Sequence, residues 1–79
     1  MNNTLNERTP FAVFYEEHST LSVRTINTIW PFVQRNGGKL TQKVTQSLLN
    51  EIRAKRIRHA GALVLREMES FYQDVFGAE

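Results

Sequence analysis

Aromatic and apolar residues recur at helical spacing soon after the start of the chain. The run Phe11–Tyr15 follows Thr9, which can cap free N–H groups, and Pro10, which is tolerated at the first helical position. This order predicts a helix over residues 10–18. Phe, Val and Tyr also favour β structure, so a strand through the same run stays an alternative.

A second stretch has one apolar stripe at steps of three and four residues, formed by Val23, Ile26, Trp30 and Val33. The stripe predicts a helix over residues 21–35, with Ser19 or Ser22 as its cap. Pro31 has no N–H group, so the helix either kinks there or gives way to a short new one. Asn36-Gly37-Gly38 ends the stretch, although Asn-Gly also favours a hairpin between two short strands.

Between Thr41 and Phe76 the apolar residues form two stripes. The first contains Val44, Leu48 and Ile52, and the second contains Ile57, Gly61, Val64, Met68, Phe71 and Val75. At 100° per residue the stripes point roughly 160–170° apart, which a straight helix packed on one core does not allow. A break near residues 55–60 removes the conflict and predicts helices over 41–55 and 60–76. The alternative is one rod of 36 residues, about 54 Å long, with partners on opposite faces.

The stripes place the chain in the all-α class, as a small bundle of about four short helices. We expect a single helical domain over residues 9–79, preceded by a flexible segment over residues 1–8. The 79 residues are 41% hydrophobic with a mean hydropathy of −0.41, which suits a small globular domain. No secretory signal is visible and no apolar run approaches the roughly 20 residues that span a bilayer. We therefore expect a cytoplasmic protein with no membrane partner.

The inventory of reactive side chains argues against an enzyme. The chain has no cysteine, which excludes disulfides, thiolate nucleophiles and zinc–sulfur sites. The two histidines, His18 and His59, lie in no pattern typical of nucleophilic catalysis. Glu16-Glu17-His18 contains metal-binding side chains, but neighbours on a helix point in different directions. We therefore expect no catalytic residues, no cofactor, no metal and no small-molecule substrate.

The charges are unevenly distributed, although the formal net charge is only +2. From Lys39 to Arg66 there are seven cations and one anion, whereas from Glu67 onward there are four anions and no cation. The middle of the chain is therefore basic and its end is acidic. The net charge of +2 is far below the strong excess typical of a histone-like protein.

The order of elements around the glycine turn resembles a DNA-binding motif. A helix ending at Arg35, a glycine turn and a helix opening at Thr41 is the order of a helix-turn-helix. The 41–56 helix would then lie on DNA. Its side chains are of the kinds that contact phosphates and base edges. The nucleic-acid-binding candidates are Lys39, Lys43, Gln46, Asn50, Arg53, Lys55, Arg56 and Arg58.

Two short segments within residues 21–53 also match the pattern of a known family. Leu21-Ser22-Val23-Arg24 followed by Asn27, with Ser47-Leu48 and Asn50-Glu51-Ile52-Arg53 further on, resembles the C-terminal domain of the bacterial RNA polymerase α subunit. That family is a compact helical module that binds DNA and activators, so the resemblance implies a role linked to transcription. The spacer between the segments is shorter than the family's and its glycine pattern is missing, so no residue role is transferred.

A surplus of aromatic side chains favours contact with a protein. A chain this short buries only about 60–65% of its unfolded surface, which makes it difficult to cover every ring in one monomer. Large rings are also the usual anchors of interfaces. The protein-binding candidates are Phe11, Tyr15, Trp30, Tyr72 and Phe76.

These patterns together predict a small non-enzymatic regulatory or inhibitory protein. We expect it to dock on another protein, or on a second copy, through an aromatic and apolar helical surface, with the basic segment 53–58 steering the encounter. The alternative is a DNA-binding transcriptional regulator that uses the 41–56 helix. Salt separates the two, because phosphate contacts weaken steeply with salt and a hydrophobic interface does not.

Overall fold

The computed structural model describes residues 9–77, in which four helices and no strand are present. The helices are α1 (Pro10–Glu17), α2 (Val23–Arg35), α3 (Gln42–Arg53) and α4 (Ala62–Phe76). The prediction of an all-α bundle with a break before the last helix is confirmed. The strand, the hairpin and the single rod were wrong alternatives for these residues. The flexibility predicted for residues 1–8 lies outside the described residues.

Hydroxyl side chains start three of the four helices. The hydroxyl oxygens of Thr9, Ser22 and Thr41 accept hydrogen bonds from the N–H groups three residues further on, at 3.0, 3.2 and 3.2 Å. Each bond satisfies one of the first-turn N–H groups that have no partner within the helix. Helix α4 follows Gly61 and has no side-chain cap.

The glycine turn ends α2 as the sequence predicts. The Gly38 N–H donates to the Val33 carbonyl at 2.8 Å, and Gly37 has a φ of 103°, a conformation that residues with a Cβ adopt at a cost. Pro31 does not end the helix, since α2 continues through it. Because proline has no N–H, the Asn27 carbonyl lacks the donor that residue 31 normally supplies.

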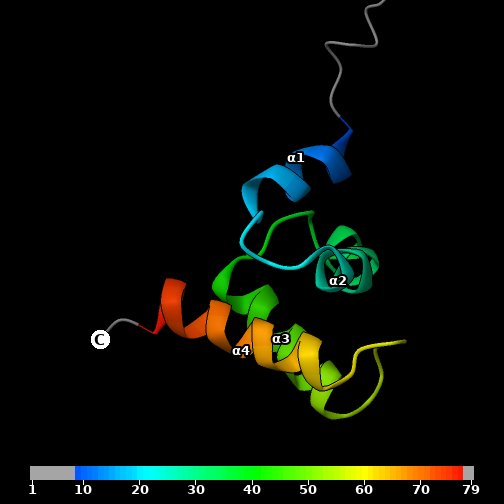
Figure 1. The fold of residues 1–79 in the computed structure, drawn as a ribbon, viewed down its shortest axis with the longest axis vertical. Helices are drawn as coiled ribbons and strands as arrows, with labels where there is room; N and C mark the ends of the chain where they lie inside the picture. The colour runs from blue at the N-terminus through cyan, green and yellow to red at the C-terminus, as the bar shows by residue number, and fades with distance from the viewer. Residues whose placement is uncertain (1–8, 78–79) are drawn as a thin grey trace, which may run out of the picture.

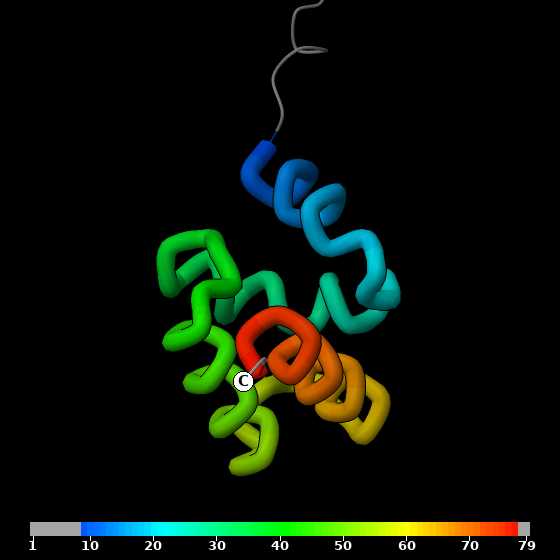
Figure 2. Tube along the Cα trace, turned by 90° about the vertical axis from the view of Figure 1, so that its left-hand side faces the viewer, coloured from blue at the N-terminus to red at the C-terminus, as the bar shows by residue number. Residues whose placement is uncertain are grey.

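Helices α2, α3 and α4 enclose the core, and α1 lies against one side of this three-helix body (Figure 1, Figure 2). Helix α4 folds back along α3, so that Leu48 and Ile52 of the first stripe meet Val64 and Met68 of the second. The break over the α3–α4 loop therefore turns the central residues of both stripes toward one core, whereas Val75, at the end of the second stripe, is 52% exposed. The buried apolar residues are Phe14, Leu21, Ile26, Ile29, Val33, Leu40, Leu48, Leu49, Ile52, Val64 and Met68.

A carboxylate from α4 completes the cap of α2. The Ser22 N–H donates to Glu67 Oε1 at 2.9 Å, while the Ser22 hydroxyl caps the Thr25 N–H. In a capping box the carboxylate comes from the third helical residue, but here that residue is Thr25, which is buried. The bond from the Ser22 N–H lowers the pKa of Glu67. This bond joins two helices that are distant in sequence.

Candidate functional site

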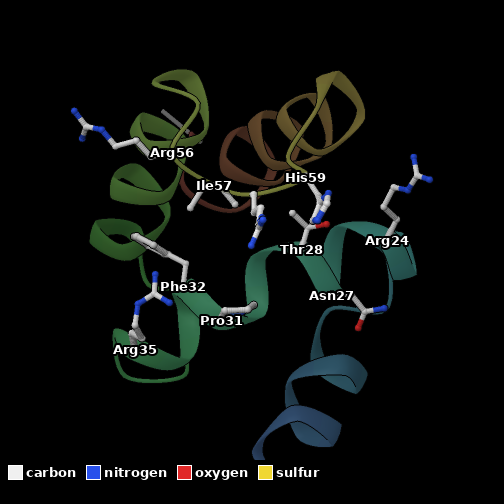
Figure 3. Close-up of a pocket in the computed structure, with 10 residues that line it drawn as sticks. Arg24, Asn27, Thr28, Pro31, Phe32, Arg35, Arg56, Ile57 and His59 are labelled. Carbon is white, nitrogen blue, oxygen red and sulfur yellow. The ribbon is translucent and has the colours of Figure 1, made fainter.

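A groove of about 880 Å³ lies between one face of α2 and the loop that joins α3 to α4 (Figure 3). Helix α2 and the loop, residues 54–61, supply its two walls. The groove is open to solvent, so its lining side chains are accessible to a large partner. The lining residues are Arg24, Asn27, Thr28, Pro31, Phe32, Arg35, Arg56, Ile57, Arg58 and His59.

The residues of α2 that form one wall of the groove lie on a single face of the helix because of their spacing. Residues at positions 24, 28, 31 and 35 repeat at steps of three and four, which places them on one face of the helix. Arg24 and Arg35 lie at opposite ends of this face (Figure 3). They are eleven positions apart, which corresponds to about 16 Å along the helix axis at 1.5 Å per residue. The wall therefore has a cation at each end.

The loop wall begins with the motif that ends α3. The Lys55 N–H donates to the Ile52 carbonyl at 3.0 Å, and the Arg56 N–H donates to the Glu51 carbonyl at 2.9 Å. The bond to the carbonyl five residues earlier is also present in the glycine turn after α2, but here Lys55 occupies the position where glycine is common. Its φ of 62° is left-handed, and so is the φ of 65° at His59.

Left-handed backbone costs a residue with a Cβ about 1–2 kcal/mol. Lys55 and His59 are the two non-glycine residues with positive φ within residues 9–77, and both lie in this loop. Such strain concentrates at functional sites, where the position of a side chain outweighs its conformational cost. The loop is therefore a candidate for function on backbone geometry alone.

The groove is strongly cationic. Four arginines and His59 line it, and no aspartate or glutamate among the described residues does. Within residues 9–77, no ion pair joins Arg24, Arg35 or Arg58 to a carboxylate. Arg56 pairs with Glu51 at 3.2 Å, but the arginine side chain is 69% exposed, and a pair of this kind contributes at most about 1 kcal/mol. The groove therefore attracts anions.

Apolar side chains form part of the groove between the arginines. Phe32 and Ile57 are half-buried, and both pack against the core on their inner sides. The Arg35 guanidinium carbon lies 5.9 Å from the centre of the Phe32 ring, a cation–π contact. Figure 3 shows Phe32 near Arg35 at one end of the groove, with its ring on the side of α3, and Ile57 on the facing loop. The groove thus combines arginines with apolar side chains, among which Phe32 lies beside Arg35.

Two of the nucleic-acid-binding candidates on α3 are engaged with α4. Gln46 Nε2 donates to the Tyr72 hydroxyl at 2.7 Å, and Arg53 Nη2 donates to Glu69 Oε2 at 3.0 Å. Both contacts are exposed, so they are weak, but they turn these two side chains along α4. The face of α3 therefore does not present all of its predicted residues together.

The other candidates divide between the groove and the rest of the surface. Arg56 and Arg58 line the groove, where they join the two arginines of α2. The candidates that lie outside it, all exposed, are Lys39, Lys43, Asn50 and Lys55.

The five protein-binding candidates belong to one chain of ring contacts that links α1 to Trp30 of α2 and, through His18, to α4. Successive ring centres are 4.6 to 6.1 Å apart in the order Tyr15, Phe11, Trp30, Phe14, His18, Phe71, Phe76 and Tyr72. Only Tyr15 among the five is exposed, at 37%, and the other four are half-buried. These rings therefore attach α1 and the end of α4 to the body of the molecule.

His18 lies inside this chain, with ring centres 4.6 Å from Phe14 and 5.4 Å from Phe71. Burial lowers its pKa, because a charged imidazolium is poorly solvated between two rings, although nearby Glu17 opposes the shift. The neutral form of His18 therefore suits this position.

Within residues 9–77, no three His, Asp or Glu side chains gather where they could hold a metal ion. None of the described helices is both long enough and apolar enough to cross a membrane. Comparisons with protein-family models, with curated proteins and with solved structures each gave no match. The partial resemblance of residues 21–53 therefore gains no support from them.

The patterns in the sequence did not indicate the α2 half of the groove. Arg24, Thr28, Pro31 and Arg35 recur at helical spacing, which was the available signal. The apolar stripe on the opposite side of the same helix drew attention to the core instead. The loop half was found only as a run of basic residues, and its position against α2 depends on tertiary folding.

Proposed function

We propose that this chain is a small non-enzymatic nucleic-acid-binding protein and that the arginine groove is its contact site. The single observation that supports this most is the lining of the groove, with four arginines, one histidine and no described carboxylate. Arginine forms two parallel hydrogen bonds with a phosphate, which makes it well suited to a sugar–phosphate backbone.

Nucleic-acid binding was also the alternative predicted from the sequence, but the contact surface proposed here is a different one. The helix-turn-helix hypothesis places the outer face of α3 on DNA, whereas the groove uses α2 and the α3–α4 loop. Arg56 and Arg58 are common to both, and Arg24 and Arg35 are new. A regulatory role in the cytoplasm fits such a protein, and it remains part of the proposal.

The test is fluorescence anisotropy of labelled DNA, in duplex and single-stranded form, titrated with the protein. We expect binding that weakens steeply between about 50 and 200 mM salt, because phosphate contacts release counterions. Replacing Arg24 and Arg58 together by glutamine removes one cation from each wall. This change should weaken binding and reduce the salt slope by about one for each lost phosphate contact.

A matched control removes the same charge elsewhere. Lys39→Gln with Lys43→Gln takes two exposed cations from outside the groove. We expect this variant to bind more tightly than the Arg24/Arg58 variant at every salt concentration. A larger loss in the lysine variant would instead favour α3 as the contact surface, and equal binding by all three proteins would contradict the groove.

Protein contact through the aromatic surface is the second candidate function. It is favoured by exposed apolar residues on two of the helices that the ring contacts join, namely Val13 and Tyr15 on α1, each 37% exposed, and Val75 on α4, 52% exposed. Sedimentation at micromolar and submicromolar concentrations tests self-association. A wild-type dimer that becomes monomeric in Tyr15→Ser would support this candidate, and a strict monomer would oppose self-association.

A further inference from the structure

We propose that the groove takes a single-stranded segment of nucleic acid, with phosphates on the arginines and a base stacked on Phe32. This inference rests on the proposed function and adds the form of the nucleic acid and the residue that selects it. It depends on the presence of arginines and apolar side chains in one groove. The arginines alone would suit any phosphate backbone, whereas the apolar side chains favour a strand with free bases.

The apolar side chains of the groove distinguish a single strand from a duplex. A duplex presents phosphates and sugars on its outside and keeps its bases stacked inside. Seated on the groove, it would pair with the arginines but leave Phe32 and Ile57 without a flat apolar partner. An unpaired strand offers both kinds of surface, because its bases are free to turn away from the phosphates.

The Phe32 ring has the surroundings of a stacking residue. Its inner side packs on the core, which holds the ring in place, and its half-buried outer side lines the groove. The Arg35 guanidinium carbon lies over the ring, 5.9 Å from its centre, so a base that stacks there displaces the guanidinium from the ring face toward the neighbouring phosphate. Aromatic stacking contributes about 1–3 kcal/mol per base and tolerates every base, since each has a π-face.

The length of the groove suits a short segment. Arg24 and Arg35 lie about 16 Å apart along α2, and a fully stacked strand advances about 3.4 Å along its axis for each phosphate. At most about five phosphates therefore fit between the two ends, and fewer where the bases are unstacked. Arg56 and Arg58 stand on the facing wall, so the strand would have cations on both sides.

An acidic protein segment is the competing occupant. Its carboxylates would also pair with the arginines, but they would leave the Phe32 ring uncovered. The ring and its adjacent cation together favour nucleic acid, and poly-glutamate serves as the probe for the competitor.

The experiment measures the affinity of the full chain for a labelled single strand of about 12 nucleotides, for its duplex and for an abasic strand of equal length. We expect the single strand to bind about tenfold or more tightly than either of the other two. Phe32→Leu should remove most of this advantage, and Phe32→Tyr, which keeps the ring, should retain it. The abasic strand needs no protein variant, so it gives an answer even where Phe32→Leu destabilises the fold.

Equal affinity for the single strand and the abasic strand would overturn the stacking inference. If the Arg24→Gln/Arg58→Gln variant still bound the single strand and the abasic strand more weakly than wild type, the groove would remain a phosphate site and the proposed function would stand. Binding of poly-glutamate without binding of any oligonucleotide would overturn the inference and the proposed function together.

Discussion

The bond between Ser22 and Glu67 allows a quantitative prediction for stability. Glu67→Ala removes the acceptor of the Ser22 N–H, which lies 2.9 Å from Oε1, and removes a negative charge from the N-terminus of α2. A hydrogen bond to a charged group contributes about 1.5–3 kcal/mol, and a charge at a helix N-terminus about 0.3–1 kcal/mol. Glu67 is only half-buried, so water can replace part of the hydrogen bond and part of the interaction between the charge and the helix N-terminus.

We therefore expect Glu67→Ala to lower the free energy of unfolding by about 1–2 kcal/mol. In a domain of this size each kcal/mol corresponds to about 4–8 °C in Tm. Thermal unfolding followed by circular dichroism, supported by urea titration, measures the change.

The pH dependence of the unfolding free energy separates the contribution of the Glu67 negative charge from that of the hydrogen bond. The pKa of Glu67 is lowered below its ordinary value of 4.5, chiefly by the Ser22 N–H. Its contribution is therefore complete above pH 4.5 and is lost as the pH falls through the folded-state pKa. Glu67→Gln keeps an acceptor oxygen but does not titrate. The stability difference between wild type and this variant should shrink on acidification.

Glu69→Ala is the matched control. It removes a carboxylate two residues away on the same helix, whose partner Arg53 is 51% exposed. An exposed ion pair contributes about 0–1 kcal/mol, so this variant should lose less than Glu67→Ala. Equal losses in the two alanine variants, together with an unchanged difference between wild type and Glu67→Gln across pH, would refute the reasoning.

Three further predictions concern the core, the turns and the aromatic chain. Met68→Ala should cost about 2–5 kcal/mol, because Met68 is completely buried, whereas Met68→Leu should cost less than about 1.5 kcal/mol, both by urea titration. Lys55→Gly should raise the unfolding free energy by about 1 kcal/mol and Gly37→Ala should lower it by a similar amount, since both positions are left-handed; opposite signs in thermal unfolding would contradict this. Because burial lowers the pKa of His18 below 6.5, its contribution is complete above pH 6.5 and falls as the pH drops toward the folded-state pKa. His18→Gln should flatten the pH dependence of Tm in that range, and an unchanged slope would count against the assignment.

Local sequence determined where the helices begin and end. Thr9, Ser22 and Thr41 cap their own helices through groups three residues away, and the glycine turn closes α2 by bonds within six residues. Such interactions need no distant partner, so residue order is sufficient to predict them. The change in direction of the apolar stripes likewise located the break between α3 and α4.

Only the tertiary structure decided which polar groups meet. The Ser22 N–H finds its acceptor 45 residues away on α4, at a position that no local pattern marks. The arginine groove likewise needs the outer face of α2 and the α3–α4 loop to face each other. The packing of α4 against α3 and α2 determines where the loop lies, and that packing depends on how buried side chains fit together in three dimensions. The sequence by itself therefore determined the helices and their buried faces, while the candidate site formed where separate segments converge.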